Sequence, residues 1–151
     1  HNANLYALHT IADWDPIWRL PMNSKITSQF GSSRRPPGGA PYAHTGLDLR
    51  APVGSKVYAT SRGIVVSASE QVLGGNVITI DHGRGVLSRY LHLSKFLVKV
   101  GDRVRPGQPI GKSGDTGRVE APHLHWEIRV RGYPVDPVST IQLLSRIVAL
   151  K

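Results

Sequence analysis

The chain has 151 residues, of which 40% are hydrophobic and 19% charged, so its length and composition are those of one compact globular domain. It contains no cysteine, which excludes a disulfide scaffold and any site built on thiolates. Its 19 Lys and Arg exceed its 10 Asp and Glu, and the resulting formal charge of +9 suits an anionic partner such as a nucleic acid, a membrane surface or an acidic wall polymer.

The basic residues are scattered, and Arg34–Arg35 is the single adjacent pair. Neither a polybasic block nor the interleaved aromatics of RNA-binding sheets is present, so we expect no nucleic-acid partner. No apolar run approaches the ~18 residues of a membrane span, so we expect no integral membrane segment in this chain. The first residue is His1 rather than Met, so we expect a processed product, and neither a signal nor an anchor is expected within this chain.

Residues 1–24 are predicted to be an extension packed on the domain by Tyr6, Trp14 and Trp18, because Pro16 and Pro21 exclude a long helix. Residues 25–138 are predicted to form the domain itself, in which short β-type runs alternate with Gly and Pro turn signals. The runs are Ile26–Phe30, Gly46–Arg50, Val57–Thr60, Gly63–Ser69, Asn76–Asp81, Val86–Leu93, Pro109–Lys112 and His123–Val130. Eight short strands at this spacing predict an all-β, antiparallel fold.

Two further segments complete the predicted organisation. The Gly- and Pro-rich residues 31–41 are predicted to be an exposed loop. Residues 139–151 are predicted to contain a helix, because Ser139 or Thr140 can cap it and apolar residues recur at three-to-four spacing from Ile141 to Val148.

The strongest candidate for chemistry is the segment Pro122–Glu127, with the sequence PHLHWE. On a strand, whose side chains alternate, His123, His125 and Glu127 share one face and the apolar residues between them face the core. Two imidazoles about 7 Å apart on a packed strand form a rigid platform for a metal ligand and its neighbour.

His44 and Asp48 form a second constellation. Fully extended, their Cα atoms would lie about 13 Å apart, and Gly46 between them can supply the bulge or kink that draws the two side chains together. With His125 they make a set of two histidines and one aspartate, which suits Zn²⁺ and leaves one coordination position for water.

Tyr90 and His92 are predicted to share one face of a strand, with the leucines between and after them on the other face. Beside a zinc site, His92 is a candidate to orient or protonate the reacting groups. His82 lies in a turn and is expected to be structural, and the two histidines of the extension are given no role in the site.

The acidic residues narrow the mechanism by exclusion. There is no HExxH helix and no Gly-x-Ser-x-Gly elbow, which excludes the usual glutamate base of that metalloprotease class and a serine nucleophile of the elbow type. Glu127 with Asp48 is the single pair of acids that a glycosidase could use. Of the hydrolytic mechanisms considered, the one that remains is hydrolysis by a zinc-bound water with a histidine as the general base.

Three ordered motifs resemble those of the lysostaphin/LytM-type M23 metallopeptidases, which are zinc endopeptidases of peptidoglycan. They are H-x-x-x-D at His44–Asp48, Y-x-H-L at Tyr90–Leu93 and H-x-H at His123–His125. The resemblance covers about residues 20–138 and extends to the neighbouring segments Ile26–Gly31, Ala51–Gly54, Gly75–Gly83, Val100–Val104 and Gly107–Gly117.

The resemblance implies an antiparallel β fold with a groove and one Zn²⁺ per chain, to which the residue pattern of the chain's end adds a short C-terminal helix. It makes His44, Asp48 and His125 the zinc ligands, and His92 and His123 the catalytic histidines, without deciding which is the base. A zinc-activated water would attack a peptide carbonyl with histidine acid–base assistance.

The partners that this resemblance implies are peptidoglycan peptides, together with anionic cell-wall polymers that attract a basic domain. The location it implies is the periplasm or the cell wall outside the cell, and we expect a monomer. It does not distinguish a glycine bridge from a D-amino-acid cross-link as the bond that is cut.

Three alternatives stay open. A catalytically inactive M23-like regulator of cell-wall amidases would have lost ligands, whereas all five positions are filled here. The segments Ala51–Gly54 and Val98–Lys112 resemble the sequence of a biotinyl or lipoyl carrier. No lysine lies in the acidic or Met-Lys-Met sequence context that the modified lysine of a carrier needs. A basic nucleic-acid-binding barrel would bind DNA in a salt-dependent manner.

Overall fold

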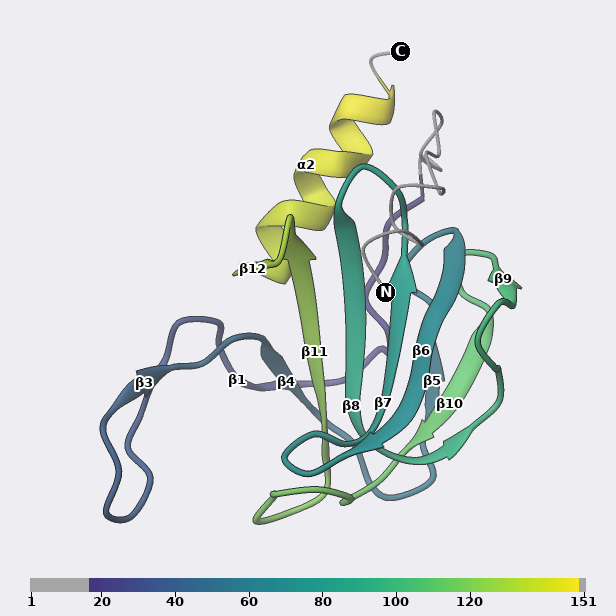
Figure 1. The fold of residues 1–151 in the computed structure, drawn as a ribbon. Coiled ribbons are helices and arrows are strands. Elements are labelled where there is room, and N and C mark those ends of the chain that lie inside the picture. The colour runs from purple at the N-terminus through teal and green to yellow at the C-terminus, as the bar shows by residue number, and fades with distance from the viewer. Residues whose placement is uncertain (1–16, 150–151) are drawn as a thin grey trace.

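The longest strands lie side by side in one antiparallel sheet (Figure 1). The computed structural model describes residues 17–149, so the expectations for Tyr6 and Trp14, and for the last two residues of the chain, lie outside the described residues. The strands are β1 (Ile26–Ser28), β2 (Ser33–Arg34), β3 (Tyr42–Ala43), β4 (Leu47–Arg50), β5 (Lys56–Tyr58), β6 (Gly63–Gln71), β7 (Gly75–Asp81), β8 (Val86–Phe96), β9 (Arg103–Val104), β10 (Pro109–Ser113), β11 (His123–Val130) and β12 (Tyr133–Val135), and the helix is α2 (Pro137–Ala149).

In the main sheet the strand order is β1–β4–β11–β8–β7–β6–β9. Strand β10 pairs with β5 and β8, and β12 pairs with β11. Every pairing is antiparallel, so the expectation of an all-β antiparallel fold with one short C-terminal helix is confirmed.

Side-chain alternation on the central strands builds the core. On β11, Leu124, Trp126 and Ile128 are fully buried, and on β7 Ile78 and Ile80 pack into the same cluster. Burying each such side chain is worth about 1.5–3 kcal/mol, which fixes which face of β11 points inward. His123, His125 and Glu127 are therefore left on the opposite face of the strand, as the alternation predicts.

The segment before β1 is part of this core. Trp18 and Met22 are only 7% and 8% exposed and belong to the buried cluster. The backbone holds the segment as well, because Arg19 N–H donates to Thr60 O at 2.9 Å and Tyr58 N–H donates to Pro21 O at 2.8 Å. Within residues 17–149, no helix is both long and apolar enough to span a membrane.

The expectation that residues 31–41 are entirely loop is wrong at one point. Ser33–Arg34 forms the strand β2, which pairs with β3 in a separate two-stranded sheet, and this hairpin projects from the main sheet (Figure 1). A two-residue strand is too short to show an alternation in the sequence, and the same holds for β3 and β9.

The helix begins before residue 139, which is where the sequence pattern predicts its start. Helix α2 begins at Pro137, a residue suited to the first helical position, and Asp136 precedes it. Asp136 accepts hydrogen bonds from the Ser139 hydroxyl, through its carboxylate, and from Thr140 N–H, through its backbone carbonyl. The cap is therefore Asp136 rather than Ser139 or Thr140.

A bulge in β8 changes the direction of His92. Between Asn76↔Leu93 and Ile78↔Tyr90, β8 contains one more residue than β7, and His92 has a φ of +62°. The bulge places Tyr90 and Leu93 together in the core and leaves His92 outside it. The expectation that Tyr90 and His92 share a face is therefore wrong, because the extra residue breaks the period of two.

Candidate metal centre

His44 and Asp48 meet because the chain bends between them. Strand β4 begins only at Leu47, and the backbone bends at Gly46. A Cβ at Gly46 would lie 2.5 Å from the carbonyl oxygen of Trp126, so only glycine lets this turn lie against β11. The kink that the sequence suggested at Gly46 is present, and it brings His44 Nε2 to 3.1 Å from Asp48 Oδ1.

Strand β11 supplies the third member of the cluster. His125 is the register partner of Asp48, and its Nδ1 lies 3.0 Å from Asp48 Oδ1 and 3.1 Å from His44 Nε2. All three residues are buried, and among residues 17–149 they are the group that could hold a metal ion. The ligand atoms of one tetrahedral zinc ion with bonds of about 2.0–2.2 Å lie about 3.3–3.6 Å apart, so the three donor atoms are already close to the spacing that one ion needs.

The second nitrogen of each of these two imidazoles faces an acceptor. His44 Nδ1 lies 2.9 Å from the carbonyl oxygen of Gln29, and His125 Nε2 lies 3.0 Å from Oε1 of Glu127. When the two rings are neutral and these outer nitrogens carry the protons, the lone pairs lie on His44 Nε2 and His125 Nδ1, the two atoms that face Asp48. Metal-binding histidines have this arrangement, so the residues present fit a zinc ion.

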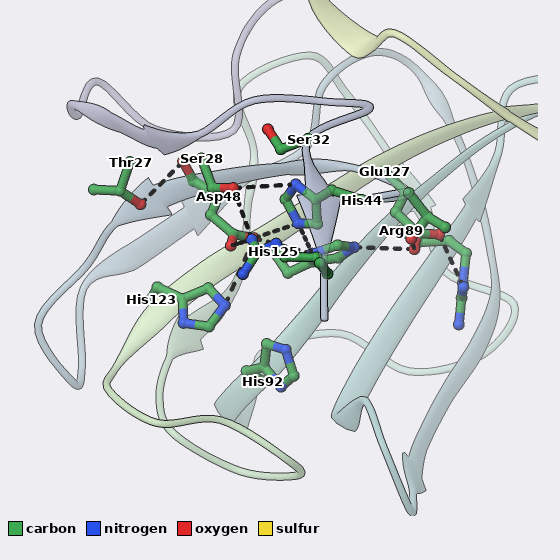
Figure 2. Close-up of polar contacts among 12 residues, drawn as sticks. Thr27, Ser28, Ser32, His44, Asp48, Arg89, His92, His123, His125 and Glu127 are labelled. Carbon is green, nitrogen blue, oxygen red and sulfur yellow. Dashed lines mark hydrogen bonds and ion pairs between the residues drawn. The ribbon is translucent and has the colours of Figure 1, made fainter. Parts of the chain in front are cut away.

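The carboxylate of Glu127 contacts the outer nitrogen of His125 and several other polar side chains (Figure 2). Besides His125 it accepts hydrogen bonds from Thr45 at 2.8 Å, from Arg89 at 2.9 Å and from Arg129 at 2.9 Å. Burial opposes its ionisation, yet His125, Arg129 and Arg89 hold the pKa of Glu127 well below its usual range. A carboxylate engaged in this way and 2% exposed is not free to act as a glycosidase acid.

Arg34 contacts the other oxygen of Asp48. Its Nη2 donates to Asp48 Oδ2 at 3.0 Å and to the Ser28 hydroxyl at 2.7 Å. Burial would raise the pKa of Asp48, but hydrogen bonds from His125 and His44 hold that pKa well below its usual range. Sequence reasoning missed this role, because the contact depends on where the β2–β3 hairpin lies in space.

His92 and His123 lie together on one side of the cluster (Figure 2). Their ring centroids are 5.0 Å apart, and the His92 ring is 6.1 Å from that of His125. His123 Nε2 is 3.6 Å from Asp48 Oδ1, and His123 Nδ1 is 2.9 Å from Ala121 O. The five residues that the sequence singled out are thus brought into one site.

The pKa values of two histidines in this site differ in direction. Burial lowers the pKa of His92 to about 4, so its ring is neutral near pH 7. Burial also disfavours a charged His125, but its hydrogen bonds to Asp48 and Glu127 raise its pKa above the usual value. The side of the site that carries His92 therefore offers a neutral imidazole.

The remaining described histidine, His82, is part of the core and away from the cluster. It is fully buried, with Nδ1 2.7 Å from Arg62 O and Nε2 2.7 Å from the Ser88 hydroxyl. That hydroxyl is in turn 2.7 Å from the Tyr90 hydroxyl. These buried contacts fit the structural role expected for His82.

The sequence profile of Peptidase family M23 matches residues 42–137. Among curated proteins, the peptidoglycan DD-endopeptidase ShyA of Vibrio cholerae is 47% identical over 121 residues, covering 78% of this chain and 28% of the relative. The chain spans about a quarter to a third of the length of the curated relatives it matches.

Solved structures give the same likeness. A zinc-containing peptidase from Vibrio cholerae has a TM-score of 0.74 at 39% identity, covering 83% of this chain and 39% of that one. The catalytic domain of the antimicrobial peptidase lysostaphin from Staphylococcus simulans has a TM-score of 0.71 at 36% identity, and the match covers 79% of this chain and 92% of that one.

Proposed function

The chain belongs to peptidase family M23, and from that membership and the site geometry we propose that it is a zinc-dependent endopeptidase of peptidoglycan. The observation that carries the proposal is the triangle of donor atoms from His44, Asp48 and His125, with sides of 3.0–3.1 Å. A catalytic zinc site of this kind has three protein ligands and one open position.

His44 Nε2, Asp48 Oδ1 and His125 Nδ1 would hold the ion. When bound, zinc acts as a Lewis acid and lowers the pKa of water to about 7. The protein contributes the fixed orientation of the ligands: Gln29 O and Glu127 hold the outer nitrogens of the two imidazoles, and Arg34 holds Asp48 Oδ2.

We assign the proton transfers to His92 and His123. Each has Nδ1 beside a backbone carbonyl, Thr116 O for His92 at 2.8 Å and Ala121 O for His123 at 2.9 Å. In that tautomer the Nε2 atoms carry the lone pairs, and His123 Nε2 is on the side of Asp48. These Nε2 atoms would accept a proton from the nucleophile and, once protonated, would return it to the leaving amine or donate to the oxygen of the scissile carbonyl.

For the substrate, the names of the curated relatives support a D-amino-acid cross-link over a glycine bridge. Peptidoglycan lies outside the cytoplasmic membrane, so the proposed location is the periplasm or the cell wall. The net charge of +9 would attract the domain to anionic wall polymers at low salt. We further propose a monomer in which residues 1–24 are an extension and residues 25–138 are the peptidase domain, followed by the C-terminal helix α2, which begins at Pro137.

The test is digestion of purified peptidoglycan. We expect new amino groups without new reducing sugar ends, loss of activity with a chelator, and recovery when zinc is added. Mass analysis of the released muropeptides from walls with and without glycine bridges identifies the bond. Reducing ends, or activity that survives complete zinc removal, would show that the proposed chemistry is wrong.

A further inference from the structure

The imidazole of His92 is held by two loops that are distant in the sequence. The first is the turn between β6 and β7, where Gly74 O accepts a hydrogen bond from His92 N–H at 2.8 Å. The second is the loop between β10 and β11, where Thr116 O lies 2.8 Å from His92 Nδ1. Backbone and ring of His92 are thus fixed by different loops, at the bulge where its φ is +62°.

Thr116 is itself fixed through its hydroxyl group. That hydroxyl donates to Leu93 O at 2.7 Å and accepts from Asn76 N–H at 3.0 Å. Asn76 adds a hydrogen bond from its side-chain amide to the same carbonyl of Leu93, at 3.0 Å. One side chain therefore ties its loop to both β7 and β8, directly beside the bulge.

Two glycines allow the loops to touch. A Cβ on Gly75, which has a φ of +68°, would lie 2.3 Å from the carbonyl carbon of Thr116. A Cβ on Gly117 would lie 2.4 Å from the backbone nitrogen of Gly75. Arg118 N–H closes the contact by donating to Leu73 O at 3.0 Å. With this packing, the carbonyl of Thr116 has little freedom to move away from His92.

We propose that Thr116 is a positioning residue, whose hydroxyl anchors the loop so that its carbonyl sets the tautomer and direction of the His92 ring. The proposal rests on the catalytic role of His92 proposed above. A histidine that works through Nε2 needs a fixed acceptor at Nδ1, and a ring that rotates or exchanges tautomers loses alignment with the reacting atoms. Thr116 need not touch the substrate to affect turnover.

The first experiment compares Thr116→Val, which removes the hydroxyl at nearly constant volume, with Thr116→Ser, which keeps it. We expect kcat of Thr116→Val to fall about tenfold or more with KM and bound zinc unchanged, and Thr116→Ser to stay near wild type. Thr140→Val is the matched control, because it removes a threonine hydroxyl that donates to Asp136 O at the start of α2. If Thr116→Val does not fold, judged by thermal unfolding, the smaller Thr116→Ala takes its place.

The second experiment asks whether the effect passes through His92. In a His92→Ala background, Thr116→Val should cause no further loss of the residual activity, because coupled residues are not additive. Nitrogen-15 spectra of the zinc-loaded protein should show His92 as one tautomer, with the proton on Nδ1, in wild type and Thr116→Ser. In Thr116→Val the His92 ring nitrogens should shift towards an average of the two tautomers.

The proposal is overturned if Thr116→Val keeps wild-type kcat, if its loss persists undiminished in the His92→Ala background, or if the His92 nitrogen spectrum does not change. A different result would reject the function of His92 itself: wild-type turnover in the single variant His92→Ala. In that case the spectra still decide whether Thr116 sets the ring, so the two failures are distinguishable.

Discussion

His125 and Glu127 are two residues apart on β11, and Nε2 of the histidine lies 3.0 Å from Oε1 of the glutamate. The period of two places both side chains on one face, and a buried carboxylate at this distance directs the other nitrogen, Nδ1, towards Asp48. Removal of that carboxylate should therefore affect the metal centre without removing a ligand.

We expect Glu127→Gln to keep the fold and to lower zinc affinity about 10–100-fold, the usual effect of losing an outer partner of a ligating histidine. The amide of glutamine is uncharged, so it would leave the positive charges of Arg89 and Arg129 without the carboxylate that they contact in the wild type. Competition with a zinc-binding dye measures the change. Arg129→Gln, which leaves the pair of His125 and Glu127 intact, is the control and should bind zinc nearly as wild type.

Alanine at His44, Asp48 or His125 should each remove most bound zinc, because two protein ligands rarely hold the ion. Metal analysis of purified protein after dialysis checks this prediction. Asp102→Asn, which changes a partly exposed carboxylate that pairs with Lys99, serves as the control and should keep one zinc per chain. Full occupancy in His125→Ala would refute the ligand assignment.

His92→Ala and His123→Ala should keep zinc and fold yet lose activity by a factor of about 10² or more, the scale for losing a general acid–base group. Neither imidazole belongs to the group of three donor residues, although both rings lie within the site. Paired zinc analysis and turnover on wall peptides test this expectation. Loss of zinc from either variant would instead make that histidine a ligand.

Tyr90→Phe should lower stability by about 1–3 kcal/mol, because the fully buried Tyr90 hydroxyl accepts from Thr60 N–H at 3.0 Å and lies 2.7 Å from the Ser88 hydroxyl. The ring faces the core, so turnover at a temperature well below unfolding should not change. Denaturant unfolding gives the free energy. A large loss of turnover with unchanged stability would place Tyr90 in the site after all.

Much of the site could be predicted from local pattern. On β11, strict alternation of Leu124, Trp126 and Ile128 in the core leaves His123, His125 and Glu127 on the other face, because a regular strand has no other choice. Residue types then suggested the chemistry, since imidazole and carboxylate groups are ligands suited to zinc.

The tertiary structure decided the direction of His92 and the partners around it. Alternation assigns His92 to the face of Tyr90, but the bulge opposite β7 reverses it, and a bulge depends on the register between two strands rather than on the sequence of one. Likewise, Arg34 and Thr116 reach Asp48 and His92 across separations of 14 and 24 residues, through contacts that arise only when hairpin and loops pack. The sequence determined which groups the site contains, and long-range packing determined which atom of each group faces its centre.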